Sequence, residues 1–285
     1  MDNVALLRCE DDFKERLREA LELVGGFGSI TPPLIVKPNI CTGSDSTGYA
    51  NVKVEAVKAL IELALEEDEG LPIRVVESNS MSKYASKAFK RFGLKDMEEE
   101  FKTSGLDVSL MNLSESPRSR MEFEGLYFKD PELPTIITEP GYMASVALPK
   151  THSLTMVTGA LKNLFGLLPK KNQSYYHQDI NEVIIDVNRI ANPQLCVIDA
   201  RVGLEGVISG NPKPIGAIIV GRKPASVDAT MARIMGFDPE RIRHLVMAQK
   251  NGLGSLNPEV IGENIESIAV QFKEPSNPKP TALIN

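Results

Sequence analysis

Residues 147–172, ALPKTHSLTMVTGALKNLFGLLPKKN, combine side chains that can do chemistry with residues suited to a protein core. The segment opens as a strand that ends at Pro149, and Lys150 and His152 follow at once. A lysine and a histidine on one loop can bind an anion or share a proton transfer, because lysine holds a charge while histidine titrates near neutrality. We therefore expect Lys150 and His152 to be catalytic residues, with His152 as general acid or base. The alternative for His152 is a structural histidine whose hydrogen bonds are satisfied within the fold.

The second half of this segment predicts a helix with a polar stripe. In a helix over 158–166, Thr158 and Lys162 are four residues apart on one face, and Thr155 lies three residues before Thr158. A helix N-terminus with hydroxyl groups and a lysine suits a phosphate or a carboxylate. The expected ligand-binding residues of this part are Thr155, Thr158, Lys162 and Asn163.

Polar side chains also follow other apolar strands at the point where each strand ends. LIV leads to Lys37 and Asn39, VVE leads to a Ser-Asn-Ser turn, and CVID ends at Asp199. Alone, the KPN turn would be read as a surface lysine beside a turn residue. Ligands of open α/β sheets lie outside the carboxyl ends of parallel strands, so these side chains are expected to converge on one crevice. Lys37 and Asn39 are therefore expected to bind the ligand.

Three acidic residues, Asp199, Glu205 and Asp228, are candidate metal ligands. Carboxylates without a thiolate or imidazole cluster suit Mg²⁺ or Mn²⁺ better than Zn²⁺. The alternatives are a loop acid in water for Glu205 and favourable charge at a helix start for Asp228. A divalent cation is thus the candidate cofactor, and the sequence names no other.

These residues need a scaffold, and the chain alternates short apolar strands with amphipathic helices. Strands at 34–37, 73–78 and 106–113 alternate with helices such as 51–68. This order predicts an α/β fold with a mainly parallel sheet and helices on both faces. Further expected elements are a helix at 11–24, strands at 135–138, 145–149, 195–200, 216–221 and 267–272, and helices at 174–191, 224–236 and 238–251. We expect one domain over 1–285, with 114–134 as a candidate inserted subdomain and a proline-rich tail over 274–285.

The charge and composition of the chain indicate which partners and which cellular compartment to expect. The formal net charge is −6 and the pI is about 5.3, which argues against nucleic acid or an acidic membrane as partner. The first residues carry acids where a secretory leader needs a basic and then an apolar run, and no apolar run has the length of a membrane span. A cytoplasmic protein is expected. Cys9, Cys41 and Cys196 are too far apart for a disulfide framework or an iron–sulfur cluster.

Several of these stretches together resemble the bacterial and archaeal family known as domain of unknown function 362. The similar stretches are LIVKPNI, ALPKTHSLTMVTGALKNLFGLLP, VIDARVGLEGVISGNP and GRKPASVDATMARIMGFDP, and the resemblance extends over nearly the whole chain. Many relatives carry a ferredoxin-like cysteine cluster that this chain lacks, so no iron–sulfur cluster is expected. Val207 and Ile208 stand where the family usually has Gly-Pro after its Glu-Gly pair. The residues on family-motif positions are Lys37, Asn39, Lys150, His152, Thr158, Lys162, Asn163, Asp199, Glu205 and Asp228.

Two functions fit these observations. The first is an enzyme, or a binding protein, with a Lys/His/Asp-lined pocket for a small anionic metabolite and His152 as general acid or base. The alternative is a non-catalytic accessory module in cofactor maturation or electron transfer, whose partner is another protein. A purely structural role for the lysines is disfavoured, because buried ion pairs are a poor source of stability.

Overall fold

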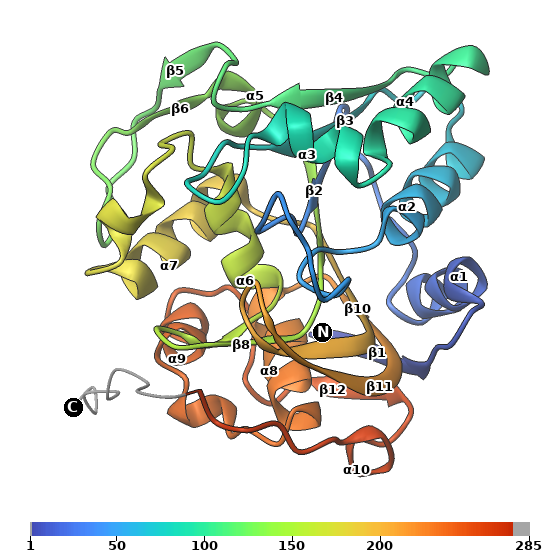
Figure 1. The fold of residues 1–285 in the computed structure, drawn as a ribbon, viewed down its shortest axis with the longest axis vertical. Helices are drawn as coiled ribbons and strands as arrows, with labels where there is room; N and C mark the ends of the chain where they lie inside the picture. Colours follow the sequence, from blue (N-terminus) through green and yellow to red (C-terminus); the bar gives the residue numbers. More distant parts are fainter. Residues whose placement is uncertain (1, 276–285) are drawn as a thin grey trace.

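The fold is built on a ten-stranded mixed sheet in the computed structural model, which describes residues 2–275 (Figure 1). The main path runs β12-β1-β11-β10-β7-β2-β3-β4, and β8 and β9 extend from β10. The block from β10 to β4 is parallel, whereas β11 is antiparallel to both β1 and β10. The predicted mainly parallel sheet is confirmed. The strands are β1 (Asn3–Arg8), β2 (Leu34–Pro38), β3 (Ile73–Glu77), β4 (Val108–Asn112), β7 (Tyr142–Ala147), β8 (Lys150–His152), β9 (Met156–Thr158), β10 (Leu195–Gly206), β11 (Gly210–Gly221) and β12 (Glu259–Gly262).

Helices cover both faces of the sheet, as predicted (Figure 1). Successive strand residues point to opposite faces, so Leu34 and Val36 join one core cluster while Ile35 joins the other. One face carries α1 (Phe13–Leu23), α2 (Val54–Glu67), α3 (Ala85–Arg91) and α4 (Leu94–Thr103). The other carries α5 (Thr135–Thr138), α6 (Ala160–Asn163), α7 (Ile180–Ala191), α8 (Pro224–Ile234), α9 (Arg243–Lys250) and α10 (Ile265–Ile268), with the 3₁₀ turns η1 (Leu164–Leu167), η2 (Gln173–Tyr176) and η3 (Pro239–Arg241). Among the helices of the described chain, none has the length and apolar character needed to cross a bilayer.

The order of the strands places a topological switch point between β2 and β7. The chain runs outward through β2, β3 and β4, and then returns to the other side of β2 as β7. Connections that leave neighbouring strands in opposite directions open a crevice at the carboxyl ends of those strands. The Lys37–Asn39 turn and the β8–β9 hairpin both follow directly from these two strands, so both are delivered to that crevice.

Three local predictions were wrong. Residues 267–272 do not form a strand, because the amides of Val270 and Phe272 bond to the carbonyls of Ile234 and Met235 at the end of α8. Residues 135–138 form the short helix α5. The helix expected over 158–166 is divided among β9, α6 and η1. Strand β1 was not predicted, although it is paired on both sides, with β11 and β12.

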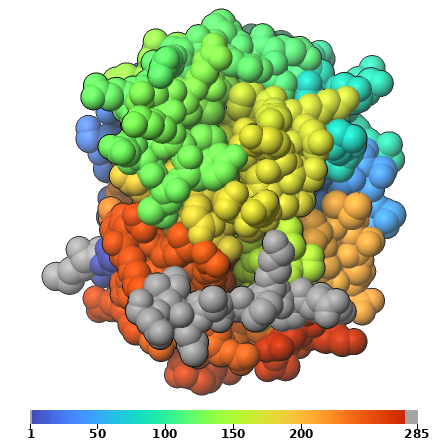
Figure 2. All heavy atoms as spheres, turned by 90° about the vertical axis from the view of Figure 1, so that its left-hand side faces the viewer, coloured from blue at the N-terminus to red at the C-terminus, as the bar shows by residue number. Residues whose placement is uncertain are grey.

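The segment 114–134 leaves the main sheet and contains its own antiparallel pair, β5 (Arg118–Arg120) and β6 (Glu132–Pro134). It lies against α7, on the face that Figure 2 shows in green and yellow. Asp186 of α7 is fully buried and accepts the amides of Leu126, Tyr127 and Phe128 at 2.7–2.9 Å. One carboxylate therefore anchors the tip of this excursion. The single-domain boundary stays a prediction, and residues 276–285 of the expected tail lie outside the described part.

Replacing Asp186 with alanine is expected to lower the free energy of unfolding by about 3 kcal/mol, because three backbone amides lose a buried, charged acceptor. Urea unfolding measures this loss, and limited proteolysis should show faster cleavage within 114–134. Asp186→Asn keeps one oxygen acceptor and should cost less. Equal stability of the alanine variant and the wild type would contradict the anchoring role.

Candidate functional site

A cavity of about 540 Å³ opens at the switch point between β2 and β7. Its walls come from the end of β2, the loop after β3, the β8–β9 hairpin and α6. Seven residues singled out in the sequence line this one cavity: Lys37, Asn39, Lys150, His152, Thr158, Lys162 and Asn163. The convergence of strand ends that the sequence predicted therefore brings these side chains together.

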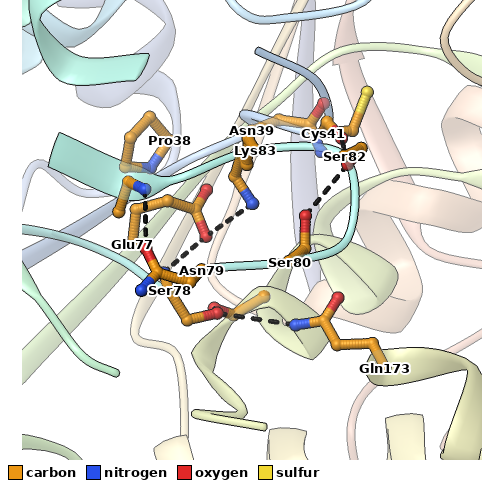
Figure 3. A network of polar contacts seen from close by, with 12 residues as sticks. Pro38, Asn39, Cys41, Glu77, Ser78, Asn79, Ser80, Ser82, Lys83 and Gln173 are labelled. Atoms are coloured by element: carbon orange, nitrogen blue, oxygen red, sulfur yellow. Dashed lines mark hydrogen bonds and ion pairs between the residues drawn. The ribbon is translucent and has the colours of Figure 1, made fainter. Parts of the chain in front are cut away.

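The floor of the cavity holds a buried charge group of two lysines and one glutamate. Lys37 Nζ lies 2.9 Å from Glu77 Oε2, and Lys83 Nζ lies 3.5 Å from Glu77 Oε1. Figure 3 shows the loop after β3 folding back so that Lys83 reaches Glu77. All three side chains are at most 3% exposed. Burial lowers the pKa of Lys37 below its ordinary value, and Glu77 opposes that shift.

A second group of hydrogen bonds fixes Lys150 against the β2 turn. Lys150 Nζ, 1% exposed, donates to Asn39 Oδ1 at 2.8 Å and to the Ala50 carbonyl at 2.9 Å. Asn39 Nδ2 donates to Asn163 Oδ1, and Asn163 Nδ2 donates in turn to the Lys37 carbonyl at 2.8 Å. Asn39 and Asn163 thus lock α6 to the end of β2. The amides of Asn39 and Asn163 are thus used within the fold, and the third donor of Lys150 points to Cys41 Sγ at 3.3 Å.

Lys162 is half-buried on α6 and forms no ion pair with any acid of residues 2–275. Burial, with the nearby charge of Lys150, lowers its pKa to about 8. Its ammonium lies 5.1 Å from the centroid of the Phe165 ring. The position of Lys162 is fixed from below, because Asp228 accepts the first amides of α6 from Ala160 and Leu161 at 2.6 and 3.0 Å.

The sequence analysis predicted Asp228 as a metal ligand, but in the structure this residue has a structural role. It is fully buried, and burial raises its pKa to about 7 against the lowering effect of those two amide bonds. A Cβ at Gly159 would lie 2.2 Å from Asp228 Oδ1, so only glycine permits this approach. The helix N-terminus expected to receive an anion is therefore already occupied by a carboxylate.

His152 is a neutral imidazole in this site. The amide of Leu154 donates to His152 Nδ1 at 3.1 Å, which places the proton of the neutral ring on Nε2. Burial and the charges of Lys162 and Lys150 lower the pKa of His152 to about 2. The sequence instead predicted a histidine that titrates near neutrality. With Nδ1 accepting the Leu154 amide, His152 Nε2 carries the proton and can act as a hydrogen-bond donor.

The two threonines behave differently. Thr158 Oγ1 is buried and has no hydrogen-bond partner, although the residue lines the cavity. Buried polar atoms are rarely left unpaired, so this hydroxyl is a candidate hydrogen-bond donor to a ligand. Thr155 instead donates to the Val157 carbonyl at 3.0 Å and does not line the cavity. The stripe that placed Thr155, Thr158 and Lys162 on one helical face is wrong, because the hairpin turn intervenes.

The three acids expected to hold a metal do not meet. Asp199 pairs with Arg201 through two oxygens at 2.8–2.9 Å and lines a separate cavity of about 410 Å³. Glu205 lies six residues further along β10, roughly 20 Å away at strand spacing, and bonds to Lys213 and the Lys273 amide. Over residues 2–275 no group of three His, Cys, Asp or Glu side chains is arranged to hold a metal ion. The predicted carboxylate metal site is therefore wrong.

The sequence analysis also missed Glu77, Lys83 and Cys41, of which Lys83 and Cys41 line the cavity. Glu77 ends a strand and Lys83 follows in a polar loop, and no spacing or periodicity in the sequence indicated that the two side chains pair. Cys41 follows the β2 turn and lies 3.3 Å from Lys150 Nζ. No pattern in the sequence indicated that this cysteine lies beside a lysine 109 positions away.

Together the fold and the cavity define a mostly parallel α/β protein with a lysine-rich cavity at the switch point of its sheet. The chain belongs to the family described as "Domain of unknown function (DUF362)", whose model matches residues 34–233.

One curated relative is the "Thylakoid-associated protein sll1697" of Synechocystis sp., which is 22% identical over 274 residues, covering 90% of this chain and 82% of the relative. Among solved structures, the fold resembles the lactate racemase apoprotein from Thermoanaerobacterium thermosaccharolyticum, with a TM-score of 0.52 and 10% identity over 82% of this chain. The chain spans 57% of the length of that structure. At this identity the likeness concerns the fold alone.

Proposed function

We propose that this protein binds a small anion carrying more than one negative charge, of the phosphate or dicarboxylate class, in the switch-point cavity. One observation carries the proposal: four lysines, Lys37, Lys83, Lys150 and Lys162, line one cavity. Glu77 forms ion pairs with Lys37 and Lys83 but not with the other two. Buried charges without partners are costly, so such an excess of positive charge favours an anionic ligand.

The ligand would lie between Lys150 and Lys162, which are not paired with an acid in the described chain. His152 would donate its Nε2 proton to the ligand, and the unpaired hydroxyl of Thr158 would donate a second bond. The Lys37–Glu77–Lys83 group would add positive potential from below. A bound dianion would also raise the pKa of His152, so any proton transfer at His152 would depend on the charge of the ligand itself.

The structural neighbour is by name a lactate racemase, and lactate is a small anion. This agreement is consistent with the proposal but adds little to it, since the argument for an anion rests on the lysines of this chain. We also propose a reducing compartment such as the cytoplasm, which the three free cysteines support.

Thermal unfolding at constant ionic strength tests the proposal. Phosphate, diphosphate, malonate and lactate are each compared with chloride, and the melting temperature is followed with ligand concentration. A saturable rise for a multiply charged anion is expected, since a ligand that binds only the folded state stabilises it by mass action. Identical melting temperatures in every salt would contradict anion binding.

The pKa of Lys162 sets an expected pH dependence of binding. Below pH 8 its ammonium is charged and attracts the anion, and above that pH the empty site loses this charge. We therefore expect affinity for sulfate, whose own charge is constant, to fall as the pH rises from about 7 to about 9. Titration calorimetry at several pH values measures this. Lys162→Met should remove the fall, and a wild-type affinity that is flat over this range would contradict the assignment.

A further inference from the structure

We infer that Cys41 is a nucleophilic thiol of this cavity and forms a covalent bond with an anionic electrophile held there. The inference deepens the proposed function, because it rests on the same lysines attracting an anion. It adds a reactive group and a chemical class of ligand: a small anion with an electrophilic carbon that bears a leaving group.

The surroundings of Cys41 suit a reactive thiol. Cys41 is half-buried and lines the cavity. Its Sγ accepts from Lys150 Nζ at 3.3 Å, and the carbonyls of Ala50 and Val207 lie 3.1 and 3.3 Å from Sγ as acceptors for the thiol proton. It lies in the loop after β2, where the hydroxyl of Ser82 donates to its carbonyl, and Figure 3 shows the two residues side by side. The thiolate is the nucleophilic form of cysteine, and partly exposed thiols beside lysines are the reactive ones.

The other two cysteines are internal controls with the opposite surroundings. Cys9 is 1% exposed and Cys196 is 0% exposed. Burial raises the pKa of Cys9 to about 12 and raises that of Cys196 well above its ordinary value. Cys9 lines the other cavity beside Arg201, and neither Cys9 nor Cys196 lines the switch-point cavity, so both serve as controls for Cys41.

A second observation points to a ligand beside Cys41. Thr158 is 5% exposed, faces the same cavity, and leaves its hydroxyl without a partner. Thr158 pairs with Lys150 across the β8–β9 hairpin, so the lysine that touches Cys41 neighbours this free donor. An anionic group held by Lys150 and Thr158 would therefore bring the attached carbon close to Sγ.

The covalent step is a substitution at carbon. The thiol proton passes to water, and a lone pair of Sγ forms the new sulfur–carbon bond. The bond between that carbon and its leaving group breaks, and the leaving group departs with the electron pair. No oxidant or reductant takes part.

Competitive alkylation tests the inference with two reagents that differ in charge. Native wild-type protein is treated with limiting iodoacetate or iodoacetamide, iodide is the leaving group, and the labelled cysteine is identified by peptide mass spectrometry. We expect Cys41 to react first. Relative to free cysteine in water, its rate ratio of iodoacetate to iodoacetamide should rise about tenfold, because the lysines attract the carboxylate.

Variants and an added anion separate the possible outcomes. Cys41→Ser should remove the fast labelling, Lys150→Met should lower the rate ratio, and the exposed Lys250→Met should leave it unchanged. Sulfate should slow labelling by iodoacetate. If sulfate stabilises the protein but Cys41 stays unlabelled or shows the ratio of free cysteine, the inference is overturned and the proposed function stands. If Cys41 prefers iodoacetate while no anion stabilises the protein, the inference is supported and the proposed function fails.

Discussion

Replacing Lys162 with methionine is expected to abolish stabilisation by anions while the empty protein becomes no less stable. Methionine keeps the length and apolar contacts of the lysine stem against Phe165 and removes the ammonium. Because that ammonium has no acidic partner in the described chain, its loss should weaken anion affinity about 100-fold without leaving a buried carboxylate unpaired.

The sign of the stability change follows from the pKa of Lys162. In the folded protein this pKa is about 8, whereas an unfolded lysine keeps its proton to about 10.5. Between these two pKa values the unfolded state therefore binds more protons than the folded state. At neutral pH the charged ammonium lowers the free energy of unfolding, and this loss becomes smaller as the pH rises from about 8 to about 10.5. Urea unfolding without anions and calorimetry with sulfate separate the two effects. The exposed Lys250→Met is the matched control. Undiminished sulfate affinity in Lys162→Met would contradict the proposed site.

Replacing Glu77 with glutamine is expected to produce the largest loss of stability. Glu77 is the carboxylate between Lys37 and Lys83, and all three side chains are buried. Removing one member of a buried ion pair leaves uncompensated charge and costs roughly 3–5 kcal/mol. Urea unfolding in chloride measures this cost.

An anion and a surface variant sharpen the Glu77 test. A bound phosphate or sulfate supplies negative charge above the two lysines, so it should restore part of the stability lost in Glu77→Gln. Glu100→Gln removes the partner of Lys58 in a pair that is 31% and 60% exposed, and it should cost at most about 1 kcal/mol. If both variants lose the same small amount of free energy of unfolding, the buried ion pairs of Glu77 with Lys37 and Lys83 would be contradicted.

The sheet and the cavity residues Lys37, Asn39, Lys150 and His152 were predictable from the sequence because they follow from strand ends. A short apolar strand followed at once by a polar residue gives the location of Lys37 and Lys150, and the parallel order of the strands brings those ends to one edge. The position of a residue can be predicted in this way when it directly follows a strand. The chemical roles of these residues remain proposals.

The charge pairing could not be predicted because it depends on how loops fold back. Nothing local distinguishes a solvated Lys83 from one that reaches under the cavity to Glu77. Asp199 and Glu205 looked like neighbours in sequence, yet an extended strand separates them and gives each its own basic partner. Asp228 was read as a ligand because a buried acid that holds two backbone amides has no sequence signature.

The most direct measurement is a crystal structure of the protein grown with selenate, a tetrahedral dianion whose selenium is located by anomalous scattering. The account predicts a selenium peak inside the switch-point cavity, with selenate oxygens within hydrogen-bond distance of Lys150 Nζ, Lys162 Nζ and His152 Nε2. A cavity that holds only water at saturating selenate, or selenate bound solely to surface lysines, would contradict it.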